Sequence, residues 1–168
     1  VADPFNDAGY DTAYFGKWHL DGPKPETGSA RAIVPRERRG GFGTWIGYEN
    51  NNNPRYTHVH GHRDDEEVPQ YLLPDFETDA LADLLIAYLR GKAEADAPFF
   101  AVLSVQPPHC PYYTAPEEWA RRHNAGNVRL RPNVPDIPRI RERARHDLAG
   151  YYALIENIDW NVGRIKTA

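Results

Sequence analysis

Residues 98–105 read Pro-Phe-Phe-Ala-Val-Leu-Ser-Val, an apolar run with the length of one β-strand. Apolar side chains on both sides of a strand are typical of a parallel strand that is covered on both faces of its sheet. The run passes directly into residues 106–112, Gln-Pro-Pro-His-Cys-Pro-Tyr, whose prolines indicate a structured loop. This stretch therefore predicts a buried parallel strand that ends in a loop carrying His109.

A second strand is expected near the start of the chain. Residues 12–15, Thr-Ala-Tyr-Phe, read as a short buried strand and are followed at once by residues 16–19, Gly-Lys-Trp-His. Before them, residues 1–10 read as the last turns of a helix that ends at Gly9. A chain that opens inside a helix is expected to be an internal piece of a longer protein.

Two helices complete the predicted alternation. Residues 75–92 carry acidic side chains at the start and basic ones at the end, as the helix dipole favours, and their leucines share one face. From about residue 139 onward, apolar residues recur at steps of three and four, which predicts a long amphipathic helix. Residues 21–74 show no sustained period and are expected to form a long excursion with one short strand near residues 44–48. Helices that alternate with strands predict an α/β sheet with helical crossovers.

The bulk composition narrows the classes of function. The chain has 168 residues, of which 40% are hydrophobic and 26% are charged, as expected for one globular domain. The formal net charge of −4 gives no reason to expect nucleic acid or an anionic membrane as a partner. No apolar run is long enough to cross a bilayer. Cys110 is the single cysteine, so an intrachain disulfide and zinc sites with two or more cysteines are excluded.

Titratable side chains follow both predicted strands. Lys17 and His19 come after the first strand, and His109 comes after the second. Open α/β sheets bind ligands outside the carboxyl ends of their strands, so parallel neighbours would bring these three side chains to one crevice. A lysine and two histidines there could hold an anionic group, and a histidine could donate a proton to a leaving oxygen. From the residues alone, a solvated lysine and hydrogen-bonded loop histidines remain an open alternative.

Two further groups of polar residues allow more than one interpretation. His58, His60 and His62 alternate, so on a strand they would point to one side and could bind zinc or nickel. The alternative for them is a polar substrate-facing or solvated loop. Asp159 falls on the apolar side of the last predicted helix. It is expected to be buried and hydrogen-bonded, with a carboxylate that supports the site from behind as the alternative.

The sequences of three stretches resemble motifs of the sulfatase family. Residues 9–20, Gly-Tyr-Asp-Thr-Ala-Tyr-Phe-Gly-Lys-Trp-His-Leu, are similar to its second signature, and residues 107–112 to its proline-histidine-x-proline motif. Residues 151–165 are similar to the long helix that follows in these enzymes. The resemblance covers essentially the whole chain, and the similar stretches occur in the same order as in the family. It implies a partial alkaline-phosphatase-like sheet flanked by helices, with residues 1–168 as an internal segment of a sulfatase catalytic domain whose N- and C-terminal parts are absent.

The resemblance also implies roles for single residues. Sulfatases use a calcium ion and a formylglycine, made from a cysteine or serine, whose hydrated aldehyde attacks sulfur. The residue matching Lys17 contacts both the sulfate and the formylglycine. The residue matching His19 hydrogen-bonds a formylglycine hydroxyl and helps to expel sulfate from the covalent intermediate. The residue matching His109 binds sulfate and assists departure of the alcohol oxygen, so all three are expected to be catalytic, and Lys17 and His109 also to bind substrate.

Other parts of the family's machinery are absent from this sequence. The cysteine-x-proline-serine-arginine motif that becomes formylglycine does not occur, and Cys110 does not replace it because Pro111 follows directly. Asp64-Asp65 could mimic the paired calcium-binding aspartates, but it falls after Lys17 in a charged run, where a solvated loop is expected. Calcium and formylglycine are therefore expected in the parent enzyme, with their ligands and the nucleophile outside this chain.

The leading hypothesis is a sulfuric-ester hydrolase that acts on a small-molecule or carbohydrate sulfate ester, with this chain as its middle segment. One alternative keeps the fold and changes the substrate to a phosphate or phosphonate ester of the same superfamily. The other is an inactive, truncated binding or interaction protein. Sheet edges left open by missing segments also predict that the isolated chain forms oligomers or aggregates.

Overall fold

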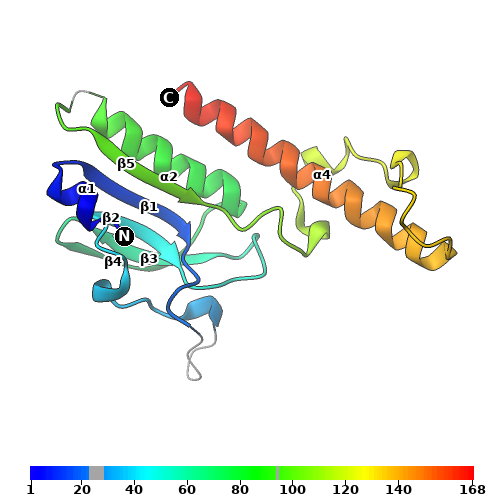
Figure 1. Cartoon of the computed structure of the whole chain (residues 1–168), viewed down its shortest axis with the longest axis horizontal. Helices are drawn as coiled ribbons and strands as arrows, with labels where there is room; N and C mark the ends of the chain where they lie inside the picture. Colours follow the sequence, from blue (N-terminus) through cyan, green and yellow to red (C-terminus); the bar gives the residue numbers. More distant parts are fainter. Residues whose placement is uncertain (23–28, 94) are drawn as a thin grey trace.

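A five-stranded mixed sheet forms the centre of the computed structural model, which describes residues 1–22, 29–93 and 95–168 (Figure 1). The strand order is β4-β3-β2-β1-β5. The β1 strand runs parallel to both of its neighbours, whereas β3 and β4 are antiparallel to the strands beside them. The strands are β1 (Asp11–Lys17), β2 (Thr44–Tyr48), β3 (His58–Arg63), β4 (Glu66–Leu72) and β5 (Phe99–Ser104).

The pairing of β1 with β5 confirms that the two strands followed by the candidate residues are parallel neighbours. The register runs from Asp11 opposite Phe99 to Gly16 opposite Ser104. The carboxyl ends of both strands therefore lie at one edge of the sheet, where Lys17 is the last residue of β1. The prediction of burial on both faces is wrong for β5, because it is an edge strand and only partly buried, with Phe99 47% exposed.

Much of the chain between the first strand and the first long helix forms regular secondary structure. The short strand expected near residues 44–48 is confirmed as β2. Beyond it, β3 and β4 form an antiparallel hairpin that the sequence pattern did not predict. The hairpin turns at Asp64-Asp65, where both residues are exposed, as expected for a solvated loop. Residues 23–28 of the excursion lie outside the described residues.

The two long helices agree with the predicted ones. The first, α2 (Glu77–Lys92), follows the hairpin, and the second, α4 (Pro138–Lys166), is the last element. Gly9 follows the first short helix with φ +80°, the left-handed conformation typical of a residue that ends a helix. The shorter elements are α1 (Asp3–Asp7), α3 (Glu117–Ala120) and 3-10 turns at Ser29–Arg31, Arg36–Arg38, Tyr112–Thr114 and Ala125–Asn127.

Each face of the sheet has its own apolar cover. On one face, Phe15 and Ile46 pack against Leu81 of α2. On the other face, Trp45 packs with Phe42 from the segment that precedes β2. Successive side chains of a strand point to opposite faces, so one short strand can contribute to both clusters. Burial of these apolar groups is the main force that holds the layers together.

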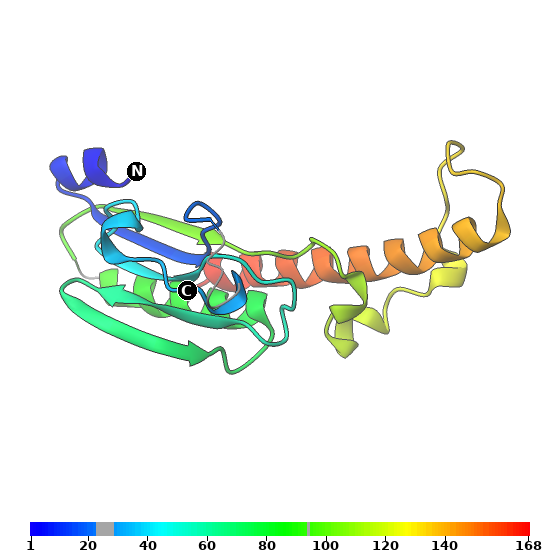
Figure 2. The same cartoon turned by 90° about the horizontal axis from the view of Figure 1, so that it is seen from below.

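The α4 helix lies beside α2 along its carboxyl-terminal half, and its other half extends away from the sheet (Figure 1, Figure 2). Asn157 and Asn161, both fully buried, donate hydrogen bonds of 2.7 and 2.6 Å to Oδ1 of Asp79 on α2. The expected burial of Asp159 is wrong, because that residue is exposed. The helix therefore turns its two asparagines, and not the aspartate between them, toward α2.

Candidate active site

The loop that carries Lys17 and His19 continues the pairing of β1 with β2. Beyond the last strand residue, the amide of Trp18 donates to the carbonyl of Tyr48 at 2.8 Å, and the amide of His19 donates to the carbonyl of Glu49 at 2.8 Å. Lys17 is half-buried, and His19 is exposed with φ 55°, a left-handed conformation unusual for a histidine. The backbone is thus fixed up to His19, where the chain turns away from the sheet.

Glu49 is a buried carboxylate that holds the far side of this turn. Its oxygens accept hydrogen bonds from the amide of Asp21 at 3.0 and 3.1 Å and from the amide of Gly22 at 2.7 Å. The buried side chain of Asp21 pairs in turn with Nε of Arg38 at 2.9 Å. Sequence reasoning missed Glu49. Glu49 directly follows a buried strand, but nothing in the local sequence indicates that its carboxylate is enclosed.

The second loop begins at the end of β5 and carries His109. The amide of His109 donates to the carbonyl of Gln106 at 3.0 Å. Its Nδ1 lies 2.6 Å from the carbonyl oxygen of Cys110. Because a carbonyl only accepts, this bond places a hydrogen on Nδ1 and leaves Nε2 as the basic nitrogen of the neutral ring. The imidazole itself is exposed.

Glu77, the first residue of α2, connects the elements behind the two loops. Its Oε1 accepts from the hydroxyl of Tyr48 at 2.7 Å and from the amide of Gln106 at 2.8 Å, and its Oε2 accepts from the hydroxyl of Thr57 at 2.8 Å. Burial raises the pKa of Glu77, whereas these hydrogen bonds and the positive charge of Lys17 act in the opposite direction. Sequence reasoning took the acidic residues here only as partners of the helix dipole.

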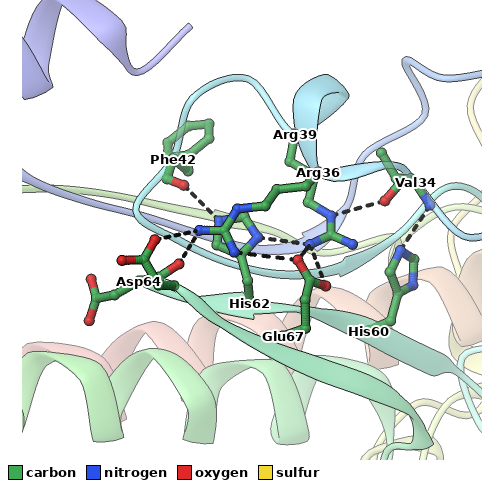
Figure 3. A network of polar contacts seen from close by, with 9 residues as sticks. Val34, Arg36, Arg39, Phe42, His60, His62, Asp64 and Glu67 are labelled. Carbon is green, nitrogen blue, oxygen red and sulfur yellow. Dashed lines mark hydrogen bonds and ion pairs between the residues drawn. The ribbon is translucent and has the colours of Figure 1, made fainter.

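The alternating histidines lie on β3, and the two buried ones form structural hydrogen bonds (Figure 3). Nε2 of His60 accepts from the amide of Val34 at 2.9 Å. Nε2 of His62 donates to the carbonyl of Phe42 at 2.8 Å, while its Nδ1 accepts from Arg39 at 2.8 Å. Burial lowers the pKa of His62, and the nearby arginines act in the same direction. Both imidazoles thus hold the segment before β2 against the sheet.

Arg39 is the centre of this network. It lies 5.3 Å from the ring centroid of Trp45, donates from Nε to the carbonyl of Val34 at 2.9 Å, and reaches both carboxylate oxygens of Glu67 at 3.1 Å. Desolvation raises the pKa of Glu67, but the hydrogen bond and charge of Arg39, together with His62, outweigh it and lower that pKa overall. Within residues 1–22, 29–93 and 95–168, no group of three or more His, Cys, Asp or Glu side chains is arranged to hold a metal ion. The structure therefore gives His58, His60 and His62 no metal-binding geometry.

Cys110 is exposed and has a free thiol. None of the helices in the described part of the chain is both long and apolar enough to span a membrane.

Comparison with known proteins places this geometry in a family. A family model described as Sulfatase matches residues 1–168. An ulvan-active sulfatase from Formosa agariphila is 34% identical over 167 residues, which cover 97% of this chain and 30% of that protein. An endo-4-O-sulfatase from Bacteroides thetaiotaomicron is 29% identical over 192 residues, which cover 100% of this chain and 36% of that protein. The chain thus spans about a third of the length of these relatives.

The fold agrees with a solved structure. The crystal structure of yidJ from Bacteroides fragilis, named as a sulfatase, has a TM-score of 0.83 and 28% identity, covering 98% of this chain and 38% of that one. The partial alkaline-phosphatase-like sheet that the sequence led us to expect is therefore confirmed. With its full length matched by the family model and its two motifs on neighbouring parallel strands, the chain belongs to the sulfatase family.

Proposed function

We propose that the protein containing this chain hydrolyses sulfate esters, and that Lys17, His19 and His109 bind the ester and assist its cleavage. The pairing of β1 with β5 is the observation that supports this most, because it ends both strands at one edge of the sheet. The relatives named as an ulvan-active sulfatase and an endo-4-O-sulfatase favour a carbohydrate sulfate ester as the substrate.

Each residue has a distinct task in this proposal. The ammonium group of Lys17 donates charge-assisted hydrogen bonds to sulfate oxygens as negative charge develops on them. His109, oriented by the bond from Nδ1 to Cys110, takes up a proton at Nε2 and donates it to the departing alcohol oxygen. His19 stands at the turn after Lys17, exposed and fixed through its own amide, and helps to release sulfate at the end of the cycle.

We infer that the parent protein works with calcium and formylglycine, as the family does. The described residues do not themselves fit either group. They hold no cluster of metal-ligating side chains, and Cys110 is followed by Pro111 instead of the residues of the formylglycine motif. We therefore assign no step in this chain to either group and propose that segments outside it supply both.

The test is hydrolysis of 4-nitrophenyl sulfate by the full-length protein that contains this chain. Lys17→Ala and His109→Ala should each lower kcat/KM by about 10²–10⁴-fold, because each removes a group that acts on the transition state. Lys166→Ala and His146→Ala are matched controls, since they remove the same side-chain types from exposed positions on α4. Both controls should retain wild-type activity.

Two results would count against the proposal. A higher kcat/KM for 4-nitrophenyl phosphate than for the sulfate would favour a phosphoryl hydrolase. Wild-type activity of the Lys17 and His109 variants would remove these residues from the site. The 168-residue chain alone should show no hydrolysis, and turnover by it would contradict the expected need for outside segments.

A further inference from the structure

Glu77 is fully buried, although its carboxylate belongs to no salt bridge in the described part of the chain. Its oxygens accept three hydrogen bonds of 2.7–2.8 Å, from Tyr48, Thr57 and the amide of Gln106. The backbone amide of Gln106 can only donate, and both hydroxyls also donate to Glu77 in this structure. This is the pattern of a carboxylate that is kept buried by directed donors, as a charge without them would be costly to bury.

Two of the three donors come from parts of the chain that lead to the candidate site. Tyr48 ends β2, which pairs with the end of β1 at Lys17. Gln106 lies between β5 and His109, and its backbone is held at both its amide and its carbonyl. Its amide donates to Glu77 at 2.8 Å, and its carbonyl accepts from the amide of His109 at 3.0 Å. A two-bond path therefore leads from the Glu77 carboxylate to the backbone of His109.

The positive charge of Lys17 acts on the pKa of this carboxylate. It stabilises the ionised form of Glu77 against the desolvation caused by burial. The carboxylate thus lies behind the site, bonded on one side to Tyr48, which pairs with Lys17, and on the other to the loop that carries His109. Removing it would loosen the loop and leave the donors of Tyr48 and Gln106 without their acceptor.

We propose that Glu77 is a positioning residue that fixes the loop carrying His109 relative to the strand end carrying Lys17. The inference rests on the proposed sulfate-ester hydrolysis, because it assigns His109 the delivery of a proton to the leaving oxygen. Misplacing a catalytic group by about 1 Å can cost about 10²-fold in rate. Glu77 acts only through the residues that it holds and does not contact the ester.

The dependence of the rate on the leaving group tests this. In the full-length protein, Glu77→Gln keeps the shape of the side chain and removes its charge. It should lower kcat for 4-nitrophenyl sulfate by about 10-fold and for unsubstituted phenyl sulfate by about 100-fold, because the poorer leaving group depends more on proton donation. Loss of folded enzyme alone would lower both rates by one common factor. Tyr48→Phe deletes one donor to the carboxylate and should show a smaller loss of the same graded kind.

Thr78→Val is the matched control. Thr78 is buried next to Glu77, and its hydroxyl has no hydrogen-bond partner within the described residues. The control should leave both rates unchanged. Equal losses on the two substrates in Glu77→Gln and Tyr48→Phe, or no loss in either, would overturn the positioning role.

A second measurement separates this inference from the proposed function. Hydrogen exchange of the Gln106 amide should become faster in Glu77→Gln and stay unchanged in Thr78→Val, whatever the protein hydrolyses. If the wild-type protein hydrolyses neither sulfate, the proposed function fails, and faster exchange still supports the role of Glu77 in fixing the loop. Unchanged exchange at Gln106 would refute the positioning role on its own.

Discussion

Gly16, directly before Lys17, shows how a single residue determines the spacing of the two motif-bearing strands. Its φ is +115°, and a Cβ at this position would overlap the backbone carbonyl of Ser104 on β5. Gly16→Ala should therefore destabilise the chain by more than the strain of about 1–3 kcal/mol expected from the backbone conformation alone. The midpoint of urea denaturation, followed by circular dichroism, measures the loss.

Gly91→Ala is the control for this prediction. Gly91 lies in α2, and a Cβ there would meet no atom within 4 Å. Replacing a helical glycine by alanine should raise the free energy of unfolding by about 0.5–1 kcal/mol. The two Gly→Ala substitutions should thus change the free energy of unfolding in opposite directions. A Gly16→Ala variant as stable as wild type would mean that β1 and β5 are not held as closely as the structure shows.

The candidate residues Lys17, His19 and His109 could be predicted because they follow strands that the apolar pattern indicates and lie in motifs that resemble those of the sulfatase family. Glu49 and Glu77 could not, although both are buried and accept several hydrogen bonds. A carboxylate of this kind carries no local pattern, because its donors come from residues up to 29 positions away. Only the assembled fold shows that these two side chains are enclosed.

At the scale of elements, the β3-β4 hairpin is the main part of the fold that the sequence did not reveal. Its inner strand, β3, is buried, yet its sequence His-Val-His-Gly-His-Arg reads as polar. Arg39 and the backbone of residues 34 and 42 form hydrogen bonds with the imidazoles of His60 and His62, so polar residues occupy positions normally read as apolar. The outer strand, β4, contains Pro69 and acidic residues, which are typical of an edge strand but give a weak strand signal.

The contact between α2 and α4 depends on Asp79, which accepts hydrogen bonds from the buried amides of Asn157 and Asn161. A hydrogen bond to a charged group contributes about 1.5–3 kcal/mol to stability. Asp79→Ala should therefore lower the free energy of unfolding by about 2–4 kcal/mol, because it also leaves the buried amide of Asn157 without an acceptor and that of Asn161 with the carbonyl of Asn157 alone. Chemical denaturation measures this directly.

Asp83→Ala is the comparison for Asp79→Ala. Asp83 lies one turn further along α2 and pairs with Arg164 of the same partner helix, but it is mostly exposed. Exposed ion pairs contribute about 0–1 kcal/mol, so this variant should be close to wild type. If both variants lost the same stability, burial of the asparagines would not be what makes the Asp79 contact strong.

For the whole molecule, the described chain leaves an open strand edge and several large apolar side chains exposed. The edge strand β5 has a strand neighbour on one side only within the described residues. Phe99 on this strand is 47% exposed, and Val162 on α4 is 48% exposed. Unpaired strand edges and exposed apolar side chains promote association with other chains. The fold thus places its candidate site beside an edge that can add further strands.

The isolated 168-residue chain should accordingly associate as its concentration rises, in a way that sedimentation velocity can follow. Phe99→Lys should shift the distribution toward the monomer, because a lysine on an edge strand opposes pairing with a second edge. Tyr113→Lys is the control, since Tyr113 is 87% exposed but lies in the 3-10 turn beyond β5. An equal shift in both variants would point to general surface hydrophobicity as the cause, and a wild-type monomer at every concentration would show that the open edge of β5 does not drive association.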